Sequence, residues 1–290
     1  MKSYIEFKQQ RELGAILTDT FAFFRMEFKP LFKAIFKIAG PYIVFFLVAL
    51  VFYVYIVGDS FNFDISKGFP STSPMMYLLA IVIYFIAAIV AYTATTSTVL
   101  HYIKSYIKHN GATDVLEVKQ NVKQTFWGFL GLSLLKWLTL FVSMMLCCLP
   151  VFYFIVPMAI VLPILVFREM NAGDSFGYGF TLTKDEFWIT LATIIVFYII
   201  IAVAASIFSV PTVIYTWIKM GIFSGAVDPS NMRSFVDPVY IFLNVLSSLF
   251  QYALNVLVTI GTAFLYFNLN ERKNFTGTME RIKAIGNTEE

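Results

Sequence analysis

Lys136 is the charged residue that lies deepest within a long apolar stretch of this chain. The stretch begins at Phe126, so at 1.5 Å per helical residue the lysine lies roughly 13 Å inside it. A charge at this depth in a membrane costs about 3 kcal/mol or more and commonly marks a functional site. The alternative is that the flexible lysine stem carries the ammonium group back to the membrane interface.

Neutral polar residues that could pair with Lys136 recur in the last apolar stretch. They are three or four positions apart, which places them on one face of a helix. They are Asn244, Ser248, Gln251, Asn255, Thr259 and Thr262. Lys136 and the first four form a candidate intramembrane polar site. Such a face either lines a path for a solute or supplies hydrogen bonds between helices, each worth about 0.6 kcal/mol.

Other reactive residue types do not form a catalytic or metal-binding pattern in the sequence. His101 and His109 are eight positions apart, whereas a metal-binding pair on a helix needs a spacing of three or four. Cys147 and Cys148 are adjacent within an apolar run, which is typical of small buried residues. We therefore expect a protein that is not an enzyme and that has no cofactor and no bound metal.

Long apolar stretches must position these residues. They are Ile38–Val57, Met75–Tyr106, Phe126–Phe167 and Phe187–Phe267. A membrane-spanning helix needs about 20 apolar residues, so the last two stretches each hold two spans. With 59% hydrophobic and 13% charged residues, the sequence predicts an all-α integral membrane protein with six transmembrane helices arranged as three hairpins.

The distribution of cations predicts how the chain is oriented. Of the 21 Lys and Arg residues, 17 fall in the N-terminal segment, in the segments after the second and fourth spans, and in the C-terminal tail. By the positive-inside rule, both termini face the cytoplasm of a bacterial inner membrane. We divide this single polytopic domain into a cytoplasmic segment 1–37, a six-span bundle 38–269 and a cytoplasmic tail 270–290.

The N-terminal segment has the pattern of an interfacial amphipathic helix. Its apolar residues recur at helical spacing, with charged residues between them, and the candidate interfacial face is Leu13, Ile16, Leu17, Phe21, Phe24 and Phe28. We expect this helix to end in a kink at Pro30. It lies either on an anionic inner leaflet or against the protein itself. The cations are spread over several segments among carboxylates, which does not favour nucleic-acid binding.

A similar arrangement recurs later in the chain. Polar stretches that begin near Gly111 and Gly173 each end in Phe-Trp before a span, and Asp114 with Glu117 resembles a helix-capping pair. The sequence thus predicts three units, each with a cytoplasmic amphipathic helix followed by a transmembrane hairpin.

Three segments carry a resemblance to a known family. They are Leu13–Asp19 with Phe28-Lys29-Pro30, Asp174-Ser175-Phe176 up to Phe187-Trp188, and Leu265-Tyr266-Phe267 ahead of Asn270-Glu271-Arg272. With these segments the chain resembles the membrane domain attached to bacterial glycerophosphoryl diester phosphodiesterases, and stand-alone bacterial proteins similar to it. The loops are too short for the phosphodiesterase barrel, so the resemblance does not imply that activity.

Two functional hypotheses follow from these features. The first is a non-catalytic scaffold or regulator of a membrane-protein partner or of lipid and envelope homeostasis. The second is a small transporter or lipid-handling channel that uses Lys136 and the polar face of the last helix. A continuous polar cavity between Lys136 and the polar face of the last helix would favour the transporter hypothesis. The sequence does not indicate an oligomeric state.

Overall fold

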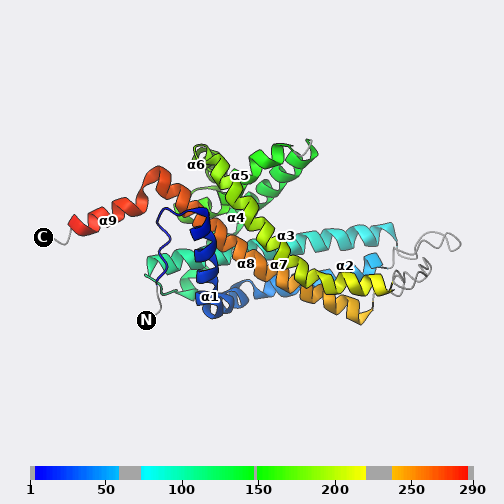
Figure 1. The fold of residues 1–290 in the computed structure, drawn as a ribbon. Coiled ribbons are helices and arrows are strands. Elements are labelled where there is room, and N and C mark those ends of the chain that lie inside the picture. Colours follow the sequence, from blue (N-terminus) through cyan, green and yellow to red (C-terminus); the bar gives the residue numbers. More distant parts are fainter. Residues whose placement is uncertain (1–3, 59–72, 147–148, 220–236, 287–290) are drawn as a thin grey trace. The chain divides into compact units, whose positions relative to one another are not determined.

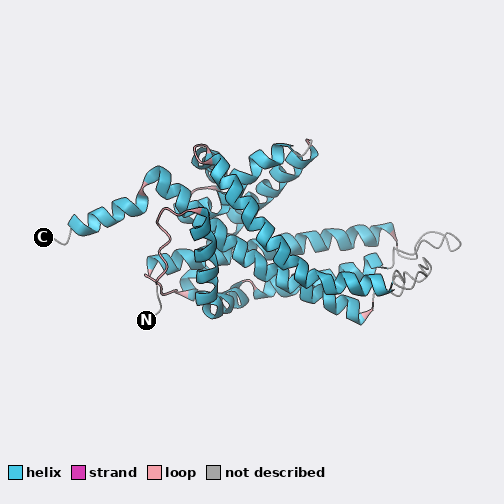
Figure 2. Ribbon diagram, viewed as in Figure 1, coloured by secondary structure: helices cyan, strands magenta, loops and turns pink. Residues whose placement is uncertain are grey.

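The computed structural model describes residues 4–58, 73–146, 149–219 and 237–286. Within these residues the chain forms helices joined by loops, without strands (Figure 2), so the all-helical prediction is confirmed for this part of the chain. Cys147 and Cys148 lie outside it. The helices are α1 (Leu13–Ile38), α2 (Gly40–Gly58), α3 (Pro74–Lys108), α4 (Val115–Met145), α5 (Leu149–Arg168), α6 (Ala172–Thr183), α7 (Phe187–Lys219), α8 (Pro238–Asn274) and α9 (Thr276–Gly286).

Five of these helices, α3, α4, α5, α7 and α8, are each long and apolar enough to cross a membrane. The sixth expected span corresponds to α2, which meets the same criterion only together with α1, and a bend of 71° separates the two. Helices of this length and composition are those of a membrane protein. The arrangement in hairpins and the side of each terminus stay predictions.

Helix α1 differs from its prediction at Pro30. We expected a kink there, but α1 continues through Pro30 to Ile38. Proline inside a helix costs ~3 kcal/mol, yet Leu31 and Ile35 extend the buried face beyond it and hold the helix together. The chain bends instead between Ile38 and Gly40. Pro41 disfavours helical backbone at the residue before it and suits the first turn of the next helix.

The second expected amphipathic helix is not a separate element. Asp114 caps α4 as predicted, because its carboxylate accepts hydrogen bonds from the backbone N–H groups of Leu116 (2.8 Å) and Glu117 (3.4 Å). However, α4 then runs unbroken to Met145, since no proline interrupts it. The third copy does form its own helix, α6, ahead of α7. In the second copy the polar stretch and the following span thus form one continuous helix, and the arrangement in three units stays a prediction.

The chain divides into two compact units, which we describe separately. The first unit comprises Met1–Ala39, Thr93–Ile199 and Val256–Glu290, and the second comprises Gly40–Tyr92 and Ile200–Asn255. The first unit contains α1, α4, α5, α6 and α9 and the second contains α2, while α3, α7 and α8 contribute a segment to each.

Aromatic side chains from distant parts of the sequence form the core of the first unit. The ring of Phe7 stacks on that of Phe264 in α8 at 4.2 Å between centroids, and it meets the ring of Phe23 in α1 edge-on at 5.1 Å. Phe23 in turn contacts Tyr106 of α3. Helix α5 lies beside α4 and α6 (Figure 1). It is buried continuously over residues 156–166.

Alanine and aromatic residues form the core of the second unit. Phe46 and Ala49 of α2 pack against Ala87 and Ala91 of α3, and Tyr252 of α8 packs on the same cluster. The alanines allow the two helices to approach closely, which is typical of helix packing in membranes. The core of this unit thus joins α2, α3 and α8.

Candidate functional site

Helix α1 carries two parallel rows of side chains outside the core of the first unit. The phenylalanine row is Phe24, Phe28, Phe32 and Phe36, and the cation row is Arg25, Lys29, Lys33 and Lys37. Residues four apart lie above one another on a helix, and the centroids of successive rings in the phenylalanine row are 5.4, 4.6 and 6.2 Å apart. The rows are therefore neighbouring ridges along the helix.

Both rows reach the surface of the protein. Phe28 is 46% exposed and Phe36 is 62% exposed, and all four residues of the cation row are exposed. Exposed rings beside a line of cations are the side-chain pattern of a helix that lies in a membrane interface.

Another face of α1 packs into the core. Ile16, Thr20, Phe23, Glu27 and Leu31 are buried, and the Glu27 carboxylate accepts a hydrogen bond of 2.7 Å from the hydroxyl of Tyr102 in α3. Helix α1 thus has one face that packs against the protein and another that is exposed, as the two alternatives for this helix require.

The six residues predicted as one interfacial face divide between these surroundings. Ile16 is buried, and Leu13, Leu17 and Phe24 are half-buried, while Phe21 and Phe28 are exposed. The six residues therefore do not form one exposed face, and the contact of the exposed ones with lipid stays a prediction.

Arg11 fixes the start of α1 to α8. Its side chain is almost fully buried, its Nε donates to Asp19 at 2.7 Å, and its backbone N–H donates to the Asn268 side chain at 2.7 Å. The guanidinium also lies 4.7 Å from the centre of the Phe264 ring. Burial lowers the pKa of Arg11, and Asp19 opposes that shift. These contacts hold α1 in one orientation, so its two rows cannot rotate into the core.

The candidate intramembrane polar site is divided between the two units. Lys136 is half-buried on α4 in the first unit, whereas Asn244, Ser248, Gln251 and Asn255 belong to the second. The Asn244 amide donates to the carbonyl of Tyr240 in its own helix at 2.9 Å, and Gln251 is exposed. Pairing of Lys136 with this face stays a prediction.

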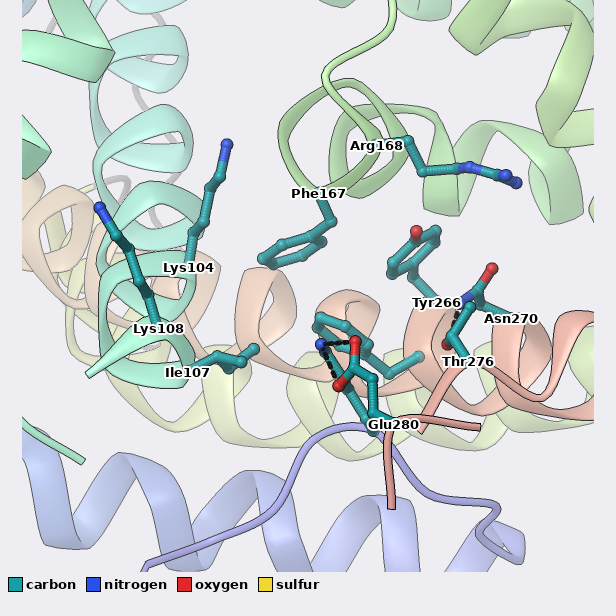
Figure 3. Close-up of a pocket in the computed structure, with 11 residues that line it drawn as sticks. Lys104, Ile107, Lys108, Phe167, Arg168, Tyr266, Asn270, Thr276 and Glu280 are labelled. Carbon is teal, nitrogen blue, oxygen red and sulfur yellow. Dashed lines mark hydrogen bonds and ion pairs between the residues drawn. The ribbon is translucent and has the colours of Figure 1, made fainter. Parts of the chain in front are cut away.

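A pocket of about 500 Å³ lies in the first unit. Its lining comes from the N-terminal segment and from α3, α5, α8 and α9, and the residues are Lys8, Lys104, Ile107, Lys108, Phe167, Arg168, Tyr266, Phe267, Asn270, Thr276 and Glu280. We call it the basic pocket, because four cations and one carboxylate line it. Figure 3 shows Lys104 and Lys108 extending from α3, with the rings of Phe167 and Tyr266 between them and Asn270.

Ion pairs surround the basic pocket. Lys8 Nζ lies 2.6 Å from Glu280, and Lys104 Nζ lies 2.7 Å from Glu169. The hydrogen bond from Lys104 lowers the pKa of Glu169. Arg168 instead lies over the ring of Tyr178 at 4.2 Å. The lysines are thus held in place by carboxylates at the rim.

The sequence alone does not predict the basic pocket. Lys104, Lys108 and Arg168 each stand at the end of an apolar stretch, a position that indicates the orientation of the chain. The same signal indicates that these cations lie at similar membrane depth. Depth does not show that they share a pocket with residues as distant as Lys8 and Asn270.

Potential metal ligands do not cluster in the described part of the chain. No group of three or more His, Cys, Asp or Glu side chains there is arranged to hold a metal ion. His101 is buried, and its Nε2 shares a hydrogen bond of 2.9 Å with the Thr125 hydroxyl. This contact supports a structural role for His101.

Comparisons of the chain with protein-family models, curated proteins and solved structures find no match. The resemblance to the membrane domain of glycerophosphoryl diester phosphodiesterases therefore stays an expectation from the sequence.

Proposed function

We propose that this chain is a non-catalytic integral membrane protein of the bacterial inner membrane that binds the anionic inner leaflet. There it acts as a scaffold or regulator of a membrane-protein partner or of lipid homeostasis. The observation that carries the proposal is the pair of rows on α1, with exposed phenylalanines beside exposed cations on a helix whose other face is fixed in the core.

The two rows match the two layers of a membrane interface. Phenylalanine rings enter the boundary between headgroups and acyl chains, while lysine and arginine stems place their charges among lipid phosphates. Each well-placed cation contributes about 1 kcal/mol on an anionic surface. Because Arg11 and the buried face already hold α1 in place, binding does not require the helix to fold first.

The transporter hypothesis has less support. It requires Lys136 to meet the polar face of α8, and the described bonds of that face include the one from Asn244 to its own helix. We therefore favour the scaffold or regulator.

The experiment is lipid selectivity in reconstituted membranes. Spin-labelled phosphatidylglycerol and phosphatidylcholine report by electron paramagnetic resonance which lipid the protein prefers at its surface. We expect the wild-type chain to prefer phosphatidylglycerol and Lys29→Gln/Lys33→Gln to lose a large part of that preference, by up to ~1 kcal/mol per cation.

Lys119→Gln/Lys123→Gln is the matched control. These two exposed lysines are also four positions apart on one helix, α4. We expect the control to keep the preference of the wild-type chain. If both double variants lose the same amount, total charge and not α1 determines the preference, and the proposal fails.

A further inference from the structure

We propose that the basic pocket binds an anionic phospholipid, with the phosphate of the headgroup among the cations and the apolar part of the lipid against the aromatic wall. None of the residues in the two rows of α1 lines this pocket. The inference is therefore independent of the contact that α1 makes with the membrane.

The charge of the pocket favours an anion. Four cations line it, and three of them pair with carboxylates: Lys8 with Glu280, Lys104 with Glu169 and Lys108 with Glu117. Among the described residues, Arg168 has no carboxylate partner within ion-pair distance, and its planar guanidinium is suited to two phosphate oxygens. The Asn270 amide donates one hydrogen to the Thr276 hydroxyl at 2.8 Å, and its second hydrogen is available to an anion.

The carboxylates at the rim do not prevent an anion from binding. Glu280 is 60% exposed and Glu169 is 74% exposed in their ion pairs with Lys8 and Lys104. Ion pairs as exposed as these contribute little to stability. A phosphate group can therefore replace either carboxylate as the partner of the lysine, while the released carboxylate returns to water.

The aromatic wall indicates that the ligand is more than a free anion. Phe167 stacks on Tyr266 with 5.5 Å between ring centroids and lies 4.6 Å from Phe267. Ile107 extends the apolar lining from α3 (Figure 3). The volume of about 500 Å³ lies in the range of pockets for small organic ligands. An inorganic ion would leave the apolar part of this space unused.

The position of the pocket along the helices fits a lipid headgroup. Helix α3 has 35 residues, about 52 Å of helix at 1.5 Å per residue, which exceeds a hydrocarbon core of about 30 Å. Lys104 and Lys108 lie in its last turns, and Arg168 is the last residue of α5. Basic pockets at such helix ends are a known means of binding anionic headgroups.

The test is isothermal titration calorimetry on the full chain in uncharged detergent. The probes are dihexanoyl-phosphatidylglycerol, dihexanoyl-phosphatidylcholine and glycerol 3-phosphate. We expect the anionic lipid to bind most tightly and glycerol 3-phosphate to bind at least about tenfold more weakly, since it lacks the apolar body. Equal affinity for glycerol 3-phosphate would show that the ligand is a free phosphate compound, and equal affinity for phosphatidylcholine would show detergent-like partitioning. Either result overturns the proposal.

Variants of opposite sign assign the binding to the pocket. Lys108 and Arg168 are exposed, so Lys108→Gln/Arg168→Gln is expected to fold and to weaken binding about tenfold. Glu169→Gln removes the competing partner of Lys104 and is expected to strengthen binding. Lys119→Gln/Lys123→Gln on α4, whose residues do not line the pocket, should bind like the wild-type chain. Unchanged affinity in both pocket variants would overturn the proposal without affecting that for α1.

Discussion

At the scale of single residues, the contacts of Glu271 join the C-terminal helix to the rest of the first unit. Its carboxylate is 1% exposed and accepts hydrogen bonds from the backbone N–H groups of Gly277 (2.7 Å) and Thr278 (2.8 Å). Gly277 also lies against the carbonyl oxygen of Lys8, so closely that a Cβ atom there would overlap it. The Glu271 carboxylate and the absence of a side chain at Gly277 thus allow α9 to pack against the N-terminal segment at Lys8.

Lys136 gives the residue-scale prediction. If its ammonium group bonds to the polar face of α8, Lys136→Met leaves an amide of that face without its donor. The free energy of unfolding should then fall by ~1–3 kcal/mol, measured by thermal unfolding in detergent. If the side chain instead reaches the interface, the same change leaves stability unchanged or raises it.

A double-mutant cycle with Gln251→Leu identifies the partner. Residues in contact couple by more than ~0.5 kcal/mol, and we expect such coupling between Lys136 and Gln251. Additive effects would remove the candidate intramembrane polar site and with it the basis of the transporter hypothesis.

At the scale of elements, Glu271 replaces the missing local cap of α9. The first N–H groups of a helix have no partner within it, and here a carboxylate from α8 accepts two of them. Glu271→Ala should therefore cost ~1–3 kcal/mol and speed hydrogen exchange of the α9 amides, measured by mass spectrometry.

Glu280→Gln serves as the control for α9. Its carboxylate lies on the same helix but is 60% exposed and pairs only with the Lys8 side chain among the described contacts. Exchange in α9 should stay near the wild-type rate in this variant. If Glu271→Ala exchanges no faster than Glu280→Gln, the cap does not stabilise α9.

The helices also show what local pattern can and cannot predict. Apolar length located α3, α5 and α7, and Asp114 located the start of α4, because these signals act within one element. The prediction of a kink at Pro30 was wrong, because burial of Leu31 and Ile35 outweighs the one hydrogen bond that proline removes. The Gly40-Pro41 pair, and not Pro30, marks the boundary between α1 and α2.

At the scale of the whole molecule, the cation distribution predicts that both termini and the segments 108–124 and 168–186 face the cytoplasm. A membrane-impermeant thiol reagent added from outside should label single cysteines at Ser66 or Ser230. Cysteines at Ser3 or Thr278 should react only after the membrane is opened. Labelling of a cysteine at position 3 in intact cells would show that the orientation is opposite to the one predicted.

For the candidate site, too, the sequence predicted features of a single helix but not contacts between helices. Helical spacing identified the apolar residues of α1 but not which of them face the core, because Ile16 and Phe21 are both apolar residues in the same pattern. The basic pocket brings Lys8, Arg168 and Asn270 together from distant positions. Periodicity describes one helix at a time, so it cannot predict a pocket made by several.

The depth of α1 in the bilayer is the measurement that tests the central claim most directly. Spin labels at Phe21 and Phe28 in nanodiscs containing phosphatidylglycerol, in a chain with Cys147 and Cys148 replaced by serine, report depth through collisions with oxygen and with a water-soluble nickel complex. Our account predicts that both labels lie just below the headgroups. Labels near the bilayer centre, or labels fully open to water, would contradict it.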